Sequence, residues 1–292
     1  MMHSVEMSKV VQGFWRLNTW QYSKAELNRY LHELIDLGVT TMDHADIYGD
    51  YTCESIFGDA LSLTPALRKQ MQIVTKCGIV LRSKTMPQFD FHKYDYSKAH
   101  IEASVERSLK MLQVDSIDLL LLHRPSPLLD TEVVADTLKG LQQKGVVQQF
   151  GVSNFKAHQF DALNQAMQRV GLDLKYNQVE LSPLTIENIE DGTLNHMKTN
   201  AVDIMAWSPL AGGDLFKTGK VQTVLNAIAH QYDTSVDDIA YRFINHLPYQ
   251  IHPIVGSKNI ERTKVALSSL DKYLTDNEWF MIYTAALGRD IL

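Results

Sequence analysis

Residues 117–152, which decide the fold, read IDLLLLHRPSPLLDTEVVADTLKGLQQKGVVQQFGV. An apolar run over 117–123 is followed by a helical segment over 130–144 that stops at Gly145, and a second apolar run covers 147–152. Short apolar runs that stop at polar residues are typical of buried strands. A helix that connects two such runs indicates a crossover in a parallel sheet. The stretch therefore predicts a strand–helix–strand unit.

The same unit recurs from end to end. Helices between the runs have recognisable ends: Ser23 with Glu26 forms a capping box, Ser235 opens another helix in the same way, and Gly38 and Gly171 end helices. No linker or low-complexity tract divides the chain, so we expect one domain over 1–292. Eight units favour a closed (β/α)8 TIM barrel, with an open doubly wound sheet as the alternative. The predicted strands cover 13–17, 39–43, 72–76, 117–123, 147–152, 176–180, 202–207 and 252–255.

Composition excludes several classes of function. With 28 basic and 34 acidic residues, the net charge of −6 gives no electrostatic reason to bind nucleic acid or an anionic membrane. Cys53 and Cys77 cannot form a disulfide framework, and no residues show metal-ligand spacing. The N-terminus lacks the apolar core of a signal peptide, and no apolar run is long enough to span a bilayer. We therefore expect a soluble, cytoplasmic protein without a metal.

Polar residues follow the predicted strands, where a barrel would bring them to one rim. Each has an ordinary structural explanation: Asp43 could begin a turn, Lys76 could leave the strand for solvent, and His123 could be a core histidine. Their occurrence together at separate strand ends favours a catalytic site. The set is Asp43, Tyr48, Lys76, His123, Ser153, Asn154, Gln178, Trp207, Ser208, Ser257 and Lys258.

Several short motifs carry a family resemblance. They are DHADIYG over 43–49, VTK over 74–76, LLLHRP over 120–125, GVSNF over 151–155, NQ over 177–178 and WSPL over 207–210. In order and in strand position they resemble the motifs of the aldo-keto reductase family, particularly its bacterial oxidoreductase branch. The resemblance runs from Gly13 to about Arg262. It implies a barrel enzyme that reduces small-molecule aldehydes and ketones, and we expect a monomer or a weak homo-oligomer.

The resemblance also implies a catalytic tetrad of Tyr48, Asp43, Lys76 and His123. Tyr48 would donate a proton to the carbonyl oxygen in reduction and accept one in alcohol oxidation. A free tyrosine titrates near ~10, so the Lys76 ammonium is expected to lower the pKa of the phenol. Asp43 would hold the lysine charged and oriented, and His123 would hydrogen-bond the carbonyl oxygen.

The family's cofactor residues carry over less uniformly. Ser153, Asn154 and Gln178 would hold the nicotinamide carboxamide. Trp207 stands where a tyrosine commonly stacks on the ring, although it could also be a core tryptophan at a strand end. The last loop departs from the pattern, because Gly256 takes the place of the usual lysine and Ala266 replaces a frequent asparagine. We expect NADPH, with NADH as the alternative; the further contacts are Ser208, Leu210, Gly212, Gly256, Ser257, Lys258 and Arg262.

Two other functions fit parts of the same pattern. A barrel that only senses the nucleotide would bind the cofactor without turnover, although it need not keep Tyr48 and His123. A Schiff-base lyase would use Lys76 as nucleophile but would leave Tyr48 without a role. Substrate identity is not encoded in any motif, and we expect specificity to come from Trp15 and the loops after the strands, including the loop over 81–96.

Overall fold

The structure, a computed structural model, describes residues 6–291. Its main sheet is a closed barrel with strand order β1-β10-β9-β8-β7-β6-β3-β2, and helices lie between successive strands along the chain. This confirms the predicted (β/α)8 fold. The barrel strands are β1 (Val11–Gly13), β2 (Thr41–Asp43), β3 (Gln72–Cys77), β6 (Ile117–Leu122), β7 (Val147–Ser153), β8 (Leu174–Glu180), β9 (Asp203–Trp207) and β10 (Ile251–Val255).

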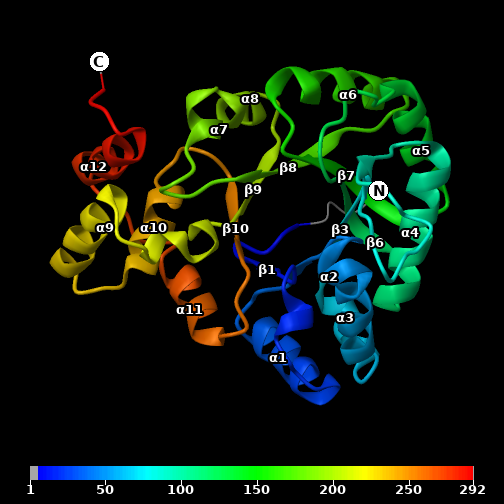
Figure 1. The fold of residues 1–292 in the computed structure, drawn as a ribbon, viewed down its shortest axis with the longest axis horizontal. Helices are drawn as coiled ribbons and strands as arrows, with labels where there is room; N and C mark the ends of the chain where they lie inside the picture. Colours follow the sequence, from blue (N-terminus) through cyan, green and yellow to red (C-terminus); the bar gives the residue numbers. More distant parts are fainter. Residues whose placement is uncertain (1–5, 292) are drawn as a thin grey trace. The chain divides into compact units, whose positions relative to one another are not determined.

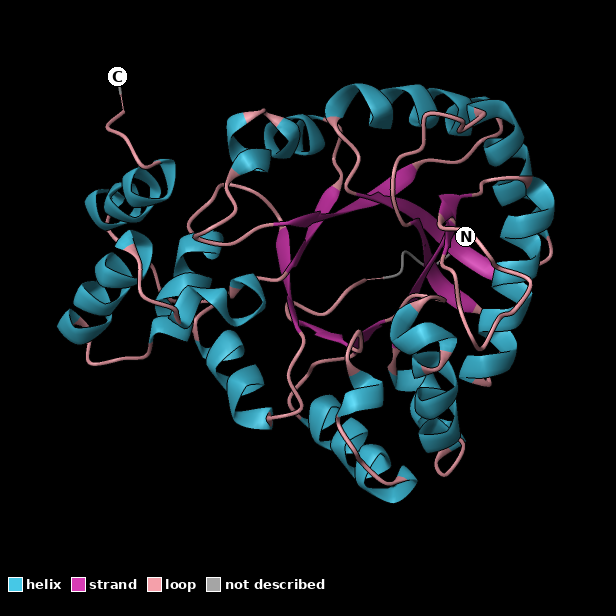
Figure 2. Ribbon diagram, viewed as in Figure 1, coloured by secondary structure: helices cyan, strands magenta, loops and turns pink. Residues whose placement is uncertain are grey.

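The chain divides into two compact units, Met1–Asn177 and Gln178–Leu292. In the first unit, the neighbouring barrel strands β1, β2, β3, β6 and β7 pair in parallel, with Asp43 opposite Val74 and Lys76 opposite Leu121. Figures 1 and 2 show its long helices outside these strands. They are α1 (Lys24–Asp36), α3 (Cys53–Leu61), α4 (Lys98–Leu112), α5 (Thr131–Gln143) and α6 (Ala157–Arg169). Short elements are η1 (Leu17–Thr19), α2 (Tyr48–Tyr51), η2 (Pro65–Gln70), β4 (Ile79–Val80) and β5 (Lys93–Tyr94).

The second unit contains the parallel pair β9 and β10 and a group of helices. The last helix packs on its neighbours through Trp279, whose indole N–H donates to the Phe243 carbonyl at 3.0 Å and whose ring stacks on the Phe243 ring. The elements are α7 (Glu187–Glu190), α8 (Thr193–Thr199), η3 (Ala211–Phe216), α9 (Lys220–Gln231), α10 (Val236–Asn245), α11 (Ile260–Ser268) and α12 (Asp276–Leu287). Within residues 6–291, no helix combines the length and apolar character needed to span a bilayer.

The predicted helix ends are confirmed. Ser23 and Glu26 form the expected capping box, Ser235 accepts from the Asp238 N–H, and Gly145 and Gly171 both have a φ of 72° just beyond a helix. These residues satisfy backbone groups that a helix end leaves without partners.

The first strand was predicted wrongly over 13–17. β1 covers Val11–Gly13, and Leu17–Thr19 is a 3₁₀ turn that begins where the Leu17 N–H donates to the Phe14 carbonyl. The aromatic residues at 14 and 15 have high strand propensity, which shifted the prediction toward the turn. The other seven predicted strands agree with the observed ones to within two residues.

His44 lies in the apolar core directly after β2. Its ring is fully buried, stacks on Phe14 with centroids 4.8 Å apart, and meets the edge of Phe57 at 4.4 Å. Neither ring nitrogen has a hydrogen-bond partner. Burial, with a smaller effect of the Lys76 charge, lowers the pKa of His44 to about 3. The side chain is therefore neutral throughout the physiological pH range.

This burial makes stability depend on pH. Between the unfolded pKa near ~6.5 and the folded pKa, the unfolded chain binds a proton at His44 that the folded chain does not, so stability falls as the pH falls through this window. We expect wild type to lose about 2–3 kcal/mol more unfolding free energy than His44→Met between about pH 6.5 and about pH 4.5. Urea unfolding at both pH values measures the difference, and parallel losses in the two proteins would contradict it.

Candidate active site

Lys76 is the centre of a buried polar cluster in the first unit. It projects from β3 with 1% of its surface exposed, and its ammonium donates to both carboxylate oxygens of Asp43 at 2.8 and 2.9 Å. It also donates to the His44 carbonyl at 2.7 Å and to the Tyr48 hydroxyl at 3.1 Å. Burial alone would lower the pKa of Lys76, but Asp43 and Tyr48 raise it, and the net direction is upward. The lysine is therefore a charged group whose donors are all used.

Tyr48 lies half-buried at the start of the short helix α2, with the Lys76 ammonium 4.9 Å from its ring centre. Burial raises the pKa of Tyr48, the Lys76 charge opposes this, and Asp43 raises it further. The net shift is upward, opposite to the direction expected from the lysine alone, because loss of water around the phenol outweighs the ammonium. Tyr48 consequently keeps its proton at neutral pH.

His123 directly follows β6 and faces Tyr48. Its backbone N–H donates to the Cys77 carbonyl at 3.0 Å, and the two aromatic rings meet edge-on with centroids 5.9 Å apart. Burial, together with the Lys76 and Arg124 charges, holds the pKa of His123 well below its usual range. The imidazole is therefore neutral. The structure thus brings together all four members of the predicted tetrad.

Two predicted cofactor residues lie in the same unit. Ser153 ends β7 and is buried, and the Asn154 side-chain amide donates to the Ser153 hydroxyl at 2.8 Å. Asn154 has a φ of 61°, a left-handed conformation that asparagine tolerates better than most residues. Because β2, β3, β6 and β7 are parallel, this pair follows its strand at the same edge of the sheet as the tetrad.

The remaining cofactor candidates lie in the second unit. Gln178 is buried in β8, and its amide approaches the Met205 sulfur at 3.9 Å. Trp207 ends β9 and is followed by a turn in which four residues have positive φ: Ser208, Ala211, Gly212 and Gly213. Leu210 is half-buried in this turn. Gly212 and Gly213 are the exposed residues among these four.

The start of α11 carries the last candidates. Asn259 caps the helix by accepting from the Glu261 N–H at 3.0 Å, and the Ser257 hydroxyl accepts from the Asn259 N–H at 3.1 Å. Gly256, Lys258 and Arg262 are exposed around this helix start. Two cations near the positive end of a helix form a suitable environment for a phosphate.

The predicted substrate residue Trp15 and the loop over 81–96 both lie in the first unit. Trp15 is 54% exposed, and the Arg16 guanidinium lies 5.0 Å from its ring centre. A small antiparallel pair that the sequence did not predict joins β4, just before this loop, to β5 within it. The Leu81 N–H of the loop donates to the Tyr51 hydroxyl at 2.9 Å, which ties the loop to the chain just after Tyr48.

Behind the tetrad lies a second set of buried polar groups that sequence reasoning missed. The Asp46 carboxylate pairs with Arg107 at 2.9 Å, and the Glu54 carboxyl accepts from the Thr75 hydroxyl at 2.6 Å. Burial raises the pKa of Asp46 to about 6 and that of Glu54 to about 7. The only signal in the sequence was the second acid of the DHADIYG motif, because Glu54 and Arg107 lie on ordinary helical faces.

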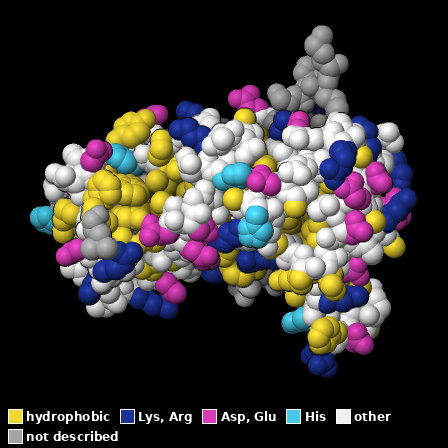
Figure 3. All heavy atoms as spheres, turned by 90° about the horizontal axis from the view of Figure 1, so that it is seen from above, with side chains coloured by type: hydrophobic (Ala, Val, Ile, Leu, Met, Phe, Trp, Pro, Cys, Tyr) yellow, Lys and Arg dark blue, Asp and Glu magenta, His cyan; other side chains and the backbone are white. Residues whose placement is uncertain are grey.

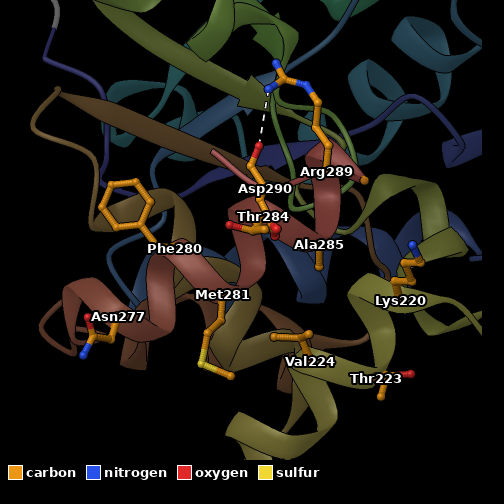
Figure 4. A pocket seen from close by; sticks show the side chains of 11 residues that line it. Lys220, Thr223, Val224, Asn277, Phe280, Met281, Thr284, Ala285, Arg289 and Asp290 are labelled. Atoms are coloured by element: carbon orange, nitrogen blue, oxygen red, sulfur yellow. Dashed lines mark hydrogen bonds between the residues drawn. The ribbon is translucent and has the colours of Figure 1, made fainter. Parts of the chain in front are cut away.

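A groove in the second unit has a different character. It lies between α9 and α12 and has a volume of about 780 Å³. Figure 3 shows a patch of hydrophobic side chains on the surface of this unit. Val224, Phe280 and Met281 contribute apolar side chains to its lining, and Lys220 and Arg289 contribute charges (Figure 4). It contains no paired acid and base like the tetrad. Among residues 6–291, no cluster of His, Cys, Asp or Glu is arranged to hold a metal ion.

Comparison with known proteins gives matches along nearly the whole chain. The sequence profile of the Aldo/keto reductase family matches residues 9–286. The chain is 47% identical to the uncharacterized oxidoreductase YcsN of Bacillus subtilis (strain 168), over 98% of this chain and 97% of the relative. It is 37% identical to a 6-dehydroglucose reductase of Agrobacterium fabrum, over 98% and 97% of the two chains.

A solved structure agrees at the level of the fold. The crystal structure of a thermostable aldo-keto reductase in complex with the inhibitor epalrestat superposes with a TM-score of 0.79, covering 96% of each chain at 23% identity. The barrel architecture is therefore shared with a protein of low sequence similarity.

The Asp43–Lys76 pair generates a test of stability. Asp43→Leu leaves a buried ammonium without its carboxylate, so we expect a loss of about 3–5 kcal/mol of unfolding free energy. Asp43→Leu with Lys76→Met replaces the whole pair by apolar groups and should recover most of that loss. Urea unfolding of the three proteins measures both effects. A double variant no more stable than Asp43→Leu would show that the buried charge is not what the aspartate stabilises.

Proposed function

The chain belongs to the aldo/keto reductase family, and we propose that it uses NADPH to reduce aldehydes and ketones to alcohols, with Tyr48 as the proton donor. The observation that carries the proposal is the contact of the Lys76 ammonium with the Tyr48 hydroxyl at 3.1 Å, beside a neutral His123. When bound, the nicotinamide supplies the hydride. The protein residues hold the carbonyl and supply the proton.

The direction of the Lys76 hydrogen bond decides where the phenol proton goes. Lys76 has only donors, so Tyr48 accepts through its oxygen and its own O–H is left to donate elsewhere. A carbonyl oxygen in the site can take that hydrogen bond and then the proton. The charge left on Tyr48 would form next to the ammonium, which stabilises it.

His123 and Asp43 have supporting roles in this proposal. A neutral imidazole can donate a hydrogen bond to the carbonyl oxygen without competing with Tyr48 for the proton transfer. Asp43 keeps Lys76 charged and fixed through two short hydrogen bonds. A Schiff-base reaction at Lys76 is disfavoured, because its raised pKa keeps the nitrogen lone pair protonated.

Each unit contains residues suited to binding one part of a dinucleotide cofactor. The Asn154–Ser153 pair offers amide and hydroxyl groups of the kind that bind a carboxamide. The start of α11 offers Ser257, Lys258 and Arg262 to a 2′-phosphate. These groups support NADPH over NADH, which lacks the phosphate.

The substrate class can be approached through the relatives. Because one of them is a 6-dehydroglucose reductase, we propose that oxidised sugars belong in a test panel beside simple aldehydes and ketones. Loss of nicotinamide absorbance after mixing the protein, NADPH and each compound measures the reaction. No turnover across the panel would favour a protein that binds the nucleotide without reducing a carbonyl.

Tyr48→Phe tests the proton donor. The change removes only the hydroxyl, so we expect carbonyl reduction to fall by at least about a hundredfold while nucleotide affinity stays nearly constant. Steady-state rates and fluorescence titration with NADPH measure the two effects. Tyr232→Phe serves as a control, because it removes a hydroxyl that bonds only to Glu278 in the other unit. Near-normal turnover in Tyr48→Phe would exclude this mechanism.

Arg262→Ala tests the cofactor preference. A charge-assisted hydrogen bond contributes about 1.5–3 kcal/mol, so its loss should weaken NADPH binding roughly ten- to a hundredfold and leave NADH almost unaffected. Lys264→Ala is the matched control, because Lys264 is an exposed cation on the same helix that pairs with Glu261. Titration of both nucleotides measures the affinities. Equal wild-type affinities, or equal losses for the two nucleotides, would contradict the assignment.

A further inference from the structure

The chain turns sharply just after Tyr48, in a conformation that most residues avoid. Three successive residues have left-handed φ values: Gly49 at 59°, Asp50 at 57° and Tyr51 at 65°. Glycine adopts this conformation readily, but Asp50 and Tyr51 carry side chains that clash with the backbone there. Contacts from outside the turn must therefore keep it in place.

One side chain, Arg107 of α4, contacts both the segment before this turn and the last residue of the turn. Its guanidinium pairs with the Asp46 carboxylate at 2.9 Å, two residues before Tyr48, and lies 5.3 Å from the ring centre of Tyr51, three residues after it. The Asp46 side chain is completely buried and also accepts from the Ser104 hydroxyl at 2.8 Å. A planar guanidinium can form an ion pair and cover a ring at the same time, which a lysine does less well.

The same turn is joined to Lys76 and to the loop over 81–96. The Asp46 N–H donates to the Lys76 carbonyl at 3.2 Å, so the segment before Tyr48 is fastened to β3. The Asp50 carbonyl accepts from the Thr85 hydroxyl at 2.6 Å, and the Tyr51 hydroxyl accepts from the Leu81 N–H at 2.9 Å. A shift of the turn would therefore move both the phenol and the loop.

We propose that Arg107 is a positioning residue for the reaction: by holding Asp46 and Tyr51, it keeps the left-handed turn in place and the Tyr48 hydroxyl on the Lys76 ammonium. The inference rests on the proposed role of Tyr48 as proton donor. Without Arg107 the turn relaxes toward ordinary backbone conformations, and the phenol leaves its place. Misplacement of a reacting group by about an ångström is enough to slow a reaction by about a hundredfold.

The chain offers a matched control in Arg68. This arginine also forms a largely buried ion pair, with Asp118 at 2.7 Å, and has nearly the same exposure as Arg107, 21% against 18%. It donates to the carbonyls of Met71 and Ser116, which precede β3 and β6, so it lies at the amino ends of the strands. Arg68→Met therefore removes a comparable pair at the edge of the sheet away from Tyr48.

The experiment compares Arg107→Met, Arg107→Lys and Arg68→Met. Arg107→Met leaves the buried Asp46 carboxylate unpaired, so a second form that combines it with Asp46→Asn removes that charge and keeps the test valid if the single variant does not fold. Two readouts are measured: the kinetic constants kcat and KM for carbonyl reduction, and the titration of Tyr48 by carbon-13 NMR of labelled tyrosine, assigned with Tyr48→Phe. The second needs no cofactor.

We expect kcat to fall roughly ten- to a hundredfold in Arg107→Met with little change in KM, and to recover partly in Arg107→Lys. The Tyr48 titration should move from its wild-type position in Arg107→Met and stay in place in Arg68→Met. The groups that face the phenol are unchanged in these variants: Lys76, Asp43, Cys53 and His123.

Two results separate the possible failures. If Tyr48→Phe kept its activity, the proposed function would be wrong whatever Arg107 does. If Tyr48→Phe were inactive but Arg107→Met matched Arg68→Met in kcat and left the Tyr48 titration in place, Arg107 would be a structural residue only and the inference would be overturned.

Discussion

A positive charge buried inside a parallel sheet is the constraint on which the site depends. The Lys76 ammonium has no contact with water, so each of its three N–H groups needs an acceptor inside the protein. The Asp43 carboxylate, the His44 carbonyl and the Tyr48 hydroxyl provide them. Asp43 is the last residue of β2 and His44 follows it directly, and Tyr48 comes after a short loop at the start of α2. Satisfying the lysine therefore also fixes the conformation of the chain from 43 to 48.

The chain from Asp43 to Asp46 is held in one conformation because its side chains contact different parts of the first unit. Asp43 turns to Lys76, while the next residue, His44, places its ring between Phe14 and Phe57 and gives only its carbonyl to the ammonium. Asp46 turns outward to Arg107 of α4. The segment is thus joined to the next strand, to the apolar core and to a helix within four residues. Such a dense set of contacts leaves the following tyrosine little freedom.

The sequence predicted the local elements of this structure better than the contacts between distant segments. Strand and helix positions were predictable because apolar runs and caps are local signals. The proximity of the four tetrad residues was predictable because they lie at or just after strand ends, whereas their assignment as a tetrad came from the family resemblance. The error at β1 arose where aromatic residues continue past the strand into a turn. The Arg107–Asp46 pair, the left-handed turn and the pairing of β4 with β5 depend on contacts between distant segments or on backbone angles, which no periodicity reveals. The direction of the Tyr48 pKa shift depends on burial, which outweighs the charge of its neighbour.

The directions of the Tyr48 and His123 pKa shifts indicate at which stage of the proposed reaction the Lys76 charge would matter. Burial keeps Tyr48 protonated and His123 neutral, so before reaction the only charges in the tetrad are those of Lys76 and Asp43, which balance each other. In the proposed reaction, proton transfer from Tyr48 to a carbonyl oxygen would leave a negative charge 3.1 Å from the buried ammonium. Under this proposal Lys76 would stabilise a charge that appears only as the reaction proceeds. Interactions that strengthen toward the transition state raise the rate, whereas uniform binding does not. In the proposed mechanism, burial of this lysine would therefore favour catalysis even though it makes the folded protein harder to stabilise.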